Sequence, residues 1–157
     1  MAYRKHNKKH QSGFTLIEVI AVLVIIGVVA AVVVSRMMSP SSFSLVSETD
    51  ILKGHLRYAQ YRAMSHTEKW GIRFPTNNSY NLLSPTATTS KLPNEDSSTH
   101  TLPSGITISS DAGTVYFNEW GNPVSDTGDL LLETTISLTD GSTTQEFTIK
   151  PNTGFIP

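Results

Sequence analysis

The sequence predicts an α+β protein, in which a long, bent N-terminal helix covers one face of an antiparallel β-sheet head. Three observations predict this class. Residues 14–34 form an almost entirely apolar run, and helical periodicity resumes at Ser44. After Lys69 the chain changes to short alternating runs that are separated by turn residues. We therefore expect four regions: a leader at 1–13, a transmembrane helix at 14–38, an amphipathic helix at 39–66 and a head at 67–157.

The first 13 residues are basic. They contain four of the 12 lysines and arginines of the chain and none of its 13 acidic residues, so residues 14–157 carry a net charge of −5. A basic segment before a transmembrane helix is retained on the cytoplasmic side of the membrane. We therefore expect the N-terminus in the cytoplasm and the head outside it. An arm that binds nucleic acid is the alternative interpretation of the basic run.

The apolar run is long enough to cross a bilayer. Its 21 residues, 14–34, would form a helix of about 30 Å, which is the thickness of the hydrocarbon core. Glu18 lies inside this run, although an ionised carboxylate costs about 2.5–3.5 kcal/mol at the centre of a transmembrane helix. Glu18 is therefore a candidate functional residue. In the alternative interpretation, its side chain only reaches the headgroup region from the first helical turn.

The start of the apolar run resembles the type III signal of type IV pilins and type II secretion pseudopilins. The resemblance rests on Gly-Phe-Thr-Leu-Ile-Glu at residues 13–18 and on the apolar helix that follows. It implies that a prepilin peptidase cuts between Gly13 and Phe14 and methylates the new amino group of Phe14. It also implies that Glu18 is required for assembly. In a medium of low dielectric constant, this carboxylate and the amino terminus of a neighbouring subunit would lower each other's desolvation cost.

A second helix is expected between Ser44 and His66. Proline at position 40 disfavours helix in the residue before it, so we expect a kink or break at residues 39–42. An apolar stripe then follows at helical spacing, and Ile51 widens it. The stripe consists of Leu45, Leu52, Leu56, Ala59 and Ala63. The opposite face carries Glu48, Asp50, Lys53, Arg57, Gln60 and Arg62, so it should be exposed.

The head is expected to contain a series of β-strands. A first hairpin is predicted from residues 70–74 and 79–83 around turn residues 75–78. Residues 84–104 are rich in Ser, Thr and Pro and are expected to form an exposed loop, either a connector or a functional loop. Asp140-Gly141 predicts a second hairpin. The further strands are expected at residues 106–108, 114–117, 130–138 and 146–149.

Four further segments narrow the resemblance to one group of pilin-like proteins. Residues 57–64, 117–123, 136–138 and 147–156 resemble H-type minor pseudopilins and related minor pilins, which implies the pilin-like fold. Gly121 and Gly154 are expected in tight turns. Some pilus relatives bind DNA through arginines in the C-terminal loop, but residues 151–155 contain none. Because DNA affinity derives largely from neutralised phosphates, we do not expect nucleic acid as a partner.

No constellation of residues predicts catalysis. The chain has no cysteine, which excludes disulfides, zinc–thiolate sites and cysteine nucleophiles. His55 and His66 are expected to be structural or solvated, and Asp126 and Asp129 to form a turn rather than a calcium site. Aromatic side chains are expected in core or turn packing rather than in a ligand platform. They are Trp70, Tyr80, Trp120 and Phe155. We therefore expect no enzyme activity, no metal site and no cofactor.

The resemblance implies a minor pilin or pseudopilin, a structural subunit that assembles into or primes a type II secretion pseudopilus or a type IV pilus. The alternative is a filament-tip binding module that contacts a surface, a secreted substrate or DNA through its head loops. The expected partners are other pilins or pseudopilins, the prepilin peptidase, the inner membrane and the assembly platform. The expected location is the bacterial inner membrane, with a single span and a periplasmic head, and then the filament.

Overall fold

The computed structural model describes residues 15–36, 40–86 and 88–157, and the side chains of residues 31–43 are not described. The described residues belong to two compact units, Met1–Met37 and Met38–Pro157, and each is described by itself. Gly13 and Phe14 lie outside the described residues. The predicted kink begins at residue 39, which also lies outside them.

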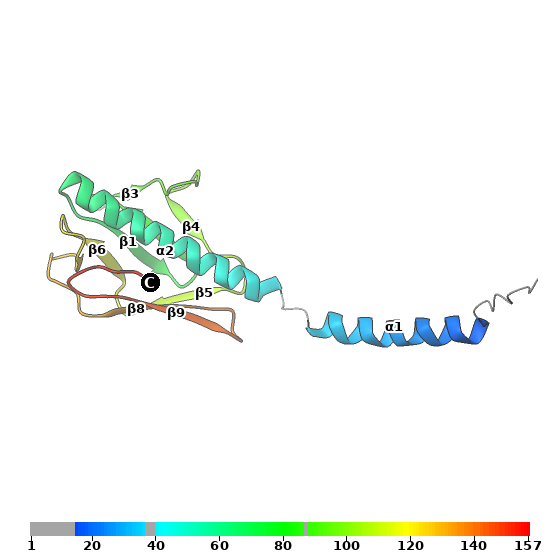
Figure 1. The fold of residues 1–157 in the computed structure, drawn as a ribbon. Helices are drawn as coiled ribbons and strands as arrows, with labels where there is room; N and C mark the ends of the chain where they lie inside the picture. Colours follow the sequence, from blue (N-terminus) through cyan, green and yellow to red (C-terminus); the bar gives the residue numbers. More distant parts are fainter. Residues whose placement is uncertain (1–14, 37–39, 87) are drawn as a thin grey trace, which may run out of the picture. The chain divides into compact units, whose positions relative to one another are not determined.

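The first unit contains helix α1, Leu16–Arg36 (Figure 1). Thr15 caps its N-terminus, because the backbone N–H of Glu18 donates to the carbonyl and to the hydroxyl of Thr15, at 3.1 and 3.4 Å. A threonine followed three residues later by a glutamate is a capping-box sequence. Among the residues that the structure describes, no helix is both long and apolar enough to span a membrane.

The second unit begins with helix α2, Pro40–His66. Proline suits the first turn of a helix, so α2 starts earlier than the predicted Ser44. All five residues of the predicted apolar stripe are completely buried, which confirms it. Ile51 was wrongly placed on that stripe, because its side chain is 37% exposed. The predicted polar face is only partly exposed: Asp50 and Arg57 face solvent, whereas Glu48 is mostly buried.

The larger sheet has six antiparallel strands in the order β3-β2-β1-β6-β7, and β4 also pairs with β2. β1 and β2 form the predicted first hairpin, which is confirmed. The predicted strand at residues 114–117 is confirmed as β6. The strand bounds are β1 Trp70–Thr76, β2 Ser79–Leu83, β3 Thr89–Ser90, β4 Thr99–Thr101, β6 Thr114–Phe117 and β7 Pro123–Val124.

The smaller sheet has three antiparallel strands in the order β5-β8-β9, so the head has two sheets rather than the expected one. Its strands are β5 Thr107–Ser110, β8 Thr134–Thr139 and β9 Thr144–Ile149. The predicted Asp140-Gly141 hairpin is confirmed: Gly141 has a φ of 87°, and Asp140 Oδ1 accepts the N–H of Thr143 at 2.7 Å. Such backbone hydrogen bonds lower the pKa of the Asp140 carboxyl.

The predicted strand at residues 130–132 is wrong. Leu130 forms only an isolated bridge to Val124, and β8 begins at Thr134. Leu130 and Leu132 are exposed, whereas Leu131 between them is partly buried against the core.

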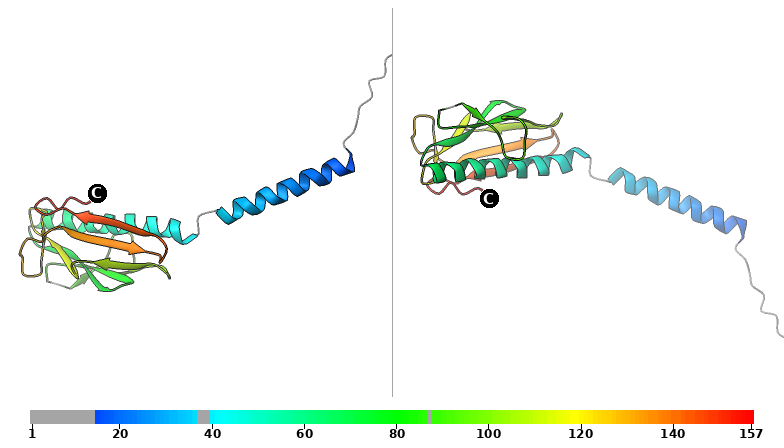
Figure 2. Two further views of the ribbon diagram at one scale, coloured as in Figure 1. Left: turned by 90° about the horizontal axis from the view of Figure 1, so that it is seen from below. Right: turned by 90° about the horizontal axis from the view of Figure 1, so that it is seen from above.

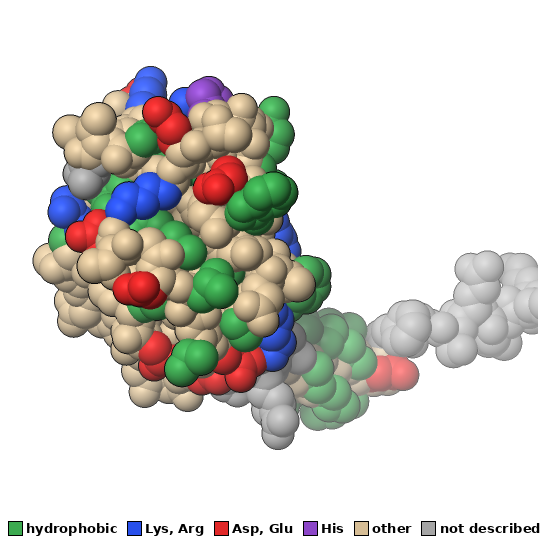
Figure 3. All heavy atoms as spheres, turned by 90° about the vertical axis from the view of Figure 1, so that its left-hand side faces the viewer, with side chains coloured by type: hydrophobic (Ala, Val, Ile, Leu, Met, Phe, Trp, Pro, Cys, Tyr) green, Lys and Arg blue, Asp and Glu red, His purple; other side chains and the backbone are tan. Residues whose placement is uncertain are grey.

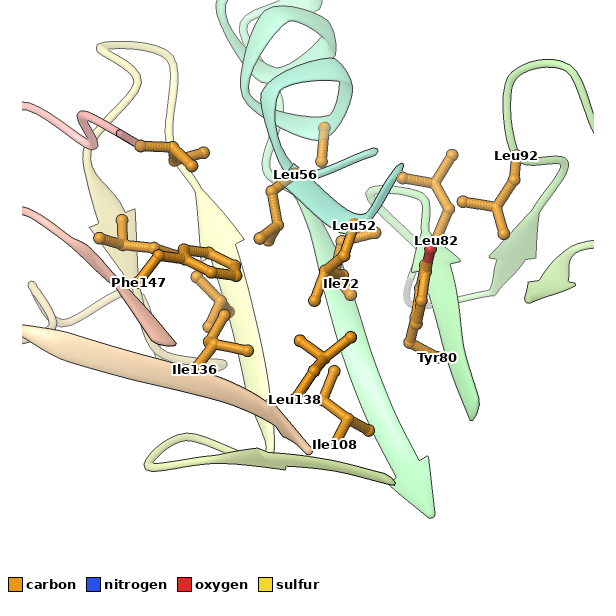
Figure 4. Packing of buried hydrophobic residues seen from close by; sticks show 14 of the residues in the cluster. Leu52, Leu56, Ile72, Tyr80, Leu82, Leu92, Ile108, Ile136, Leu138 and Phe147 are labelled. Atoms are coloured by element: carbon orange, nitrogen blue, oxygen red, sulfur yellow. The ribbon is translucent and has the colours of Figure 1, made fainter. Parts of the chain in front are cut away.

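The core lies between α2 and the two sheets. Figure 4 shows Leu52 and Leu56 of α2 pointing toward Ile72 of the larger sheet and toward Ile136 and Phe147 of the smaller one. Figure 2 shows α2 along one side of the head and the strands on the other. Each fully buried leucine or isoleucine contributes about 1.5–3 kcal/mol, and a chain without cysteine depends on this packing.

Residues 84–104 are not the exposed loop that the sequence predicts. They contain β3 and β4, and Leu92 and Leu102 are buried in the core. The N–H of Leu102 donates to the carbonyl of Asn78 at 2.8 Å, next to the first hairpin. Two leucines ten residues apart produce no periodic signal, although each anchors the segment to the head.

Candidate functional site

Of the site residues that the sequence predicts, Gly13, Phe14 and Glu18, the structure describes only Glu18. It lies in the first turn of α1, where a carboxylate suits the positive end of the helix dipole. Its side chain is exposed, beside a shallow apolar hollow that Val19, Val22 and Leu23 line with it. A carboxylate next to such a surface is available to a cation of another molecule. The two residues of the predicted cleavage site, Gly13 and Phe14, are outside the described residues.

The head contains a polar cluster that the sequence analysis missed. We call Glu48, His55, Glu95 and His100 the histidine–carboxylate cluster. Glu48 and His55 lie two turns apart on α2, Glu95 lies between β3 and β4, and His100 is in β4. Their side chains are only 8–23% exposed. Three segments of the head therefore meet at one partly buried polar site.

His100 connects the two carboxylates of the cluster. Its Nδ1 lies 2.5 Å from Glu95 Oε1, and its Nε2 lies 2.8 Å from Glu48 Oε2. Glu95 Oε1 is also 3.9 Å from His55 Nε2. Hydrogen bonds of this length to a carboxylate are stronger than neutral ones. The cluster thus links α2 to β4 and to the segment before it.

Tyr80 of β2 supports both histidines. Its hydroxyl lies 2.9 Å from His55 Nδ1, and its ring stacks on His100 with centroids 4.7 Å apart. This stacking follows from the register, because Tyr80 pairs with His100 across β2 and β4. Burial raises the pKa of the Tyr80 hydroxyl above its usual range. Burial also lowers the pKa of His55, although the charge of Glu95 opposes that shift.

The expectation that His55 is structural agrees with its burial and its hydrogen bond to Tyr80. His55, Glu95 and His100 each place one potential metal-ligand atom within 4.8 Å of the others. The sequence indicated no such grouping, because His55 lies 40 residues before Glu95 and 45 before His100, and no short motif connects positions so far apart.

A second polar anchor holds the C-terminal turn on α2. Gln60 Nε2 donates to the carbonyls of Gly121 and Gly154, at 2.8 and 3.0 Å. Both glycines have positive φ values, 80° and 61°, which confirms that they form tight turns. Arg57 also donates to the carbonyls of the last two residues, at 3.1 Å each. The C-terminus is therefore fixed against the helix.

The four aromatic side chains that were expected to pack form one buried pair and one exposed pair. Trp70 and Tyr80 are buried, as expected. The prediction of packing was wrong for Trp120 and Phe155, which are 76% and 62% exposed. Trp120 precedes Gly121 in the sequence, and Phe155 follows Gly154. The turn backbone is held against α2 by Gln60, whereas the two aromatic rings face solvent.

The remaining candidates lie apart from the cluster. His66 is exposed at the end of α2, as expected. Asp126 and Asp129 are exposed in a turn, where Thr127 donates to Asp129 at 2.6 Å and Lys69 pairs with Asp126 at 3.6 Å. Figure 3 shows one end of the head, where basic and acidic side chains are interspersed.

Comparisons with known proteins find one sequence motif and a set of structures with a similar fold. The prokaryotic N-terminal methylation motif matches residues 8–34, which include Gly13, Phe14 and Glu18. The fold is similar to that of the type IV minor pilin FimU of Pseudomonas aeruginosa (TM-score 0.58, 16% identity, 74% of this chain and 89% of FimU). It is also similar to that of the minor pseudopilin EpsH of the Vibrio cholerae type 2 secretion system (0.54, 13%, 73% and 94%). The chain therefore shares the N-terminal methylation motif and the fold of type IV pilins and pseudopilins.

A second crystal form of FimU gives a comparable match, with a TM-score of 0.55 and 15% identity. No curated protein matches the chain significantly in sequence. At these low identities the structural matches show the pilin-like fold, and the methylation motif indicates a membrane-anchored, processed protein.

Proposed function

We propose that this chain is a minor pilin or pseudopilin, which assembles into or primes a type II secretion pseudopilus or a type IV pilus. The methylation motif over residues 8–34 is the observation that carries the proposal. The pilin-like fold of the head supports it, since FimU is a type IV minor pilin and EpsH is a minor pseudopilin. The role is structural rather than enzymatic.

Processing comes first in this proposal. The prepilin peptidase cuts between Gly13 and Phe14 and methylates the amino group of Phe14. The cut removes the basic leader and leaves the apolar run of residues 14–34 at the start of the mature chain. That run anchors the protein in the inner membrane as a single span, with the head in the periplasm.

Glu18 then acts in assembly. Its exposed carboxylate lies in the first turn of α1, only four residues after Phe14. In the low-dielectric membrane region, an unpaired carboxylate is costly, and so is an unpaired amino terminus. Pairing Glu18 with the amino terminus of a neighbouring subunit offsets part of both costs. The pair therefore favours the assembled state and fixes the axial position of one subunit against the next.

The experiment is site-specific crosslinking between this protein and its filament partners in membranes. Glu18→Ala should insert normally and lose the crosslink, because it removes a carboxylate that only assembly needs. Glu18→Gln should fail nearly as badly if the charge matters. Glu68→Ala, which removes an exposed carboxylate of the head, is the matched control and should crosslink like the wild type. Equal crosslinking by Glu18→Ala at equal membrane abundance would reject the role of Glu18.

A second candidate function is that of a filament-tip binding module. The exposure of Trp120 and Phe155 favours it, because large exposed aromatic side chains frequently anchor a partner. If this function applies, the double change of both residues to Ala should leave filament formation intact and abolish contact with the target surface or secreted substrate. Unchanged contact would exclude these two side chains.

A further inference from the structure

We propose that His55, Glu95 and His100 form a zinc-binding site on the head. The ligands come from α2, from the segment after β3 and from β4. This inference concerns the head alone and does not depend on processing or assembly at the N-terminus.

The three potential ligand atoms lie close together. They are His55 Nε2, Glu95 Oε1 and His100 Nδ1, and they lie within 4.8 Å of one another. Zinc bonds of about 2.0–2.2 Å in a tetrahedral site place neighbouring ligand atoms about 3.4 Å apart. The distances from Glu95 Oε1 to the two histidine nitrogens, 3.9 and 2.5 Å, lie on either side of that value. Because the two histidine nitrogens lie within 4.8 Å of each other, side-chain shifts of about 1 Å would give zinc geometry.

The second ring nitrogen of each histidine also has a hydrogen-bond partner. The other ring nitrogen of His55, Nδ1, is hydrogen-bonded to the Tyr80 hydroxyl at 2.9 Å. The corresponding nitrogen of His100, Nε2, is 2.8 Å from Glu48 Oε2. Metal-binding histidines generally have such a partner on the second nitrogen, since it fixes the tautomer and the orientation of the ring. Glu48 and Tyr80 are therefore positioning residues and not ligands.

The donor atoms favour zinc over calcium and magnesium. Two imidazole nitrogens and one carboxylate oxygen suit Zn²⁺, whereas Ca²⁺ and Mg²⁺ require a shell of six or more oxygen ligands. A hollow of about 490 Å³ opens beside His55 and Glu95, where Gly54, Tyr58 and Asn94 also line it. It provides an entry path for the ion and room for a water molecule as the fourth ligand.

A bound ion would connect segments that the sequence separates. α2 and the segment around β4 are joined through ligands 40 or more residues apart, in a chain that has no cysteine for a disulfide. An ion that binds only the folded head stabilises it in proportion to the logarithm of its concentration. The competing arrangement is a metal-free one, in which His100 simply bridges the two carboxylates.

The test measures thermal unfolding of the untagged full-length chain in detergent micelles, with and without Zn²⁺. His6 and His10 of the leader are changed to Ala in every sample, so that they cannot bind the ion. Zn²⁺ should raise the melting temperature by several degrees at a large excess over Kd. The double change His55→Gln and His100→Gln should abolish this shift, and His66→Gln should retain it.

Direct binding keeps the proposal falsifiable if the double variant does not fold. Competition with a chromophoric chelator should give one Zn²⁺ per wild-type chain, and Glu48→Gln should weaken that binding by about 10–100-fold. Ca²⁺ and Mg²⁺ should not compete. Absence of stoichiometric Zn²⁺ binding to the wild type would overturn the proposal, and so would an unchanged Zn²⁺ affinity in the folded double variant.

Discussion

Replacing Leu52 by Ala tests whether α2 is the central packing element of the head. Leu52 is completely buried between the helix and the sheets (Figure 4). Removing its three terminal carbon atoms loses their transfer free energy and leaves a cavity, so we expect about 3 kcal/mol of destabilisation, within a range of about 2–5 kcal/mol. A domain of this size is stable by about 5–15 kcal/mol, so the effect should be large.

Leu132→Ala is the matched control, because it makes the same chemical change at a side chain that is 84% exposed. It should change the free energy of unfolding by no more than about 0.5 kcal/mol. Both variants are compared by urea unfolding in micelles, followed by the fluorescence of Trp70, which is buried in the core. Replacing Trp120 by Phe in all samples isolates that signal.

The melting temperature provides a second measure of the same difference. For a head of this length, a loss of about 3 kcal/mol corresponds to a decrease of roughly 10 °C. If Leu52→Ala and Leu132→Ala shift the unfolding midpoint equally, α2 does not pack on the sheets as described, and the reasoning fails.

Three further predictions concern the head. Gly154→Ala should destabilise the C-terminal turn strongly, since the added Cβ would overlap the carbonyl of Gly121. The control is Gly128→Ala, whose added Cβ meets no atom within 4 Å, so it should destabilise the head less. Urea unfolding measures the free energy of unfolding of both variants. Because burial lowers the pKa of His55 below 6.5, the unfolded chain binds a proton more readily, so stability should be complete above pH 6.5 and decrease as the pH falls below it. His55→Gln should reduce that decrease, measured by unfolding with chelator present at pH 5.5–7.5, and an unchanged pH profile would contradict it. Residues 39–157 alone should be a soluble monomer that unfolds cooperatively and is insensitive to reductant, and insolubility from several start sites would argue against an independent core.

The sequence predicted the parts of the fold that local physics determines. The stripe from Leu45 to Ala63 was predictable because a helix that covers a sheet must be apolar at 3.6-residue spacing. The two hairpins were predictable because turn residues and alternation specify them. The segment at residues 84–104 was not, since its order depends on two isolated leucines and on pairing with β2.

The two candidate sites also differ in whether the sequence could predict them. Glu18 could be selected from the sequence because a single charge in an apolar run is unusual wherever the chain folds. The histidine–carboxylate cluster could not, because His55 and His100 meet only through the register of β4 on β2 and the packing of α2 on that sheet. Long-range contacts of this kind leave no pattern along the chain.

The central claim is that this chain is processed as a pilin-family subunit, and the intact mass of the protein from bacterial membranes tests it most directly. The expected mass is that of a mature chain that begins at Phe14 and carries one added methyl group, and Gly13→Val should leave the precursor in the membrane. A chain that keeps Lys5 and the rest of the leader, in cells with an active prepilin peptidase, would contradict the account.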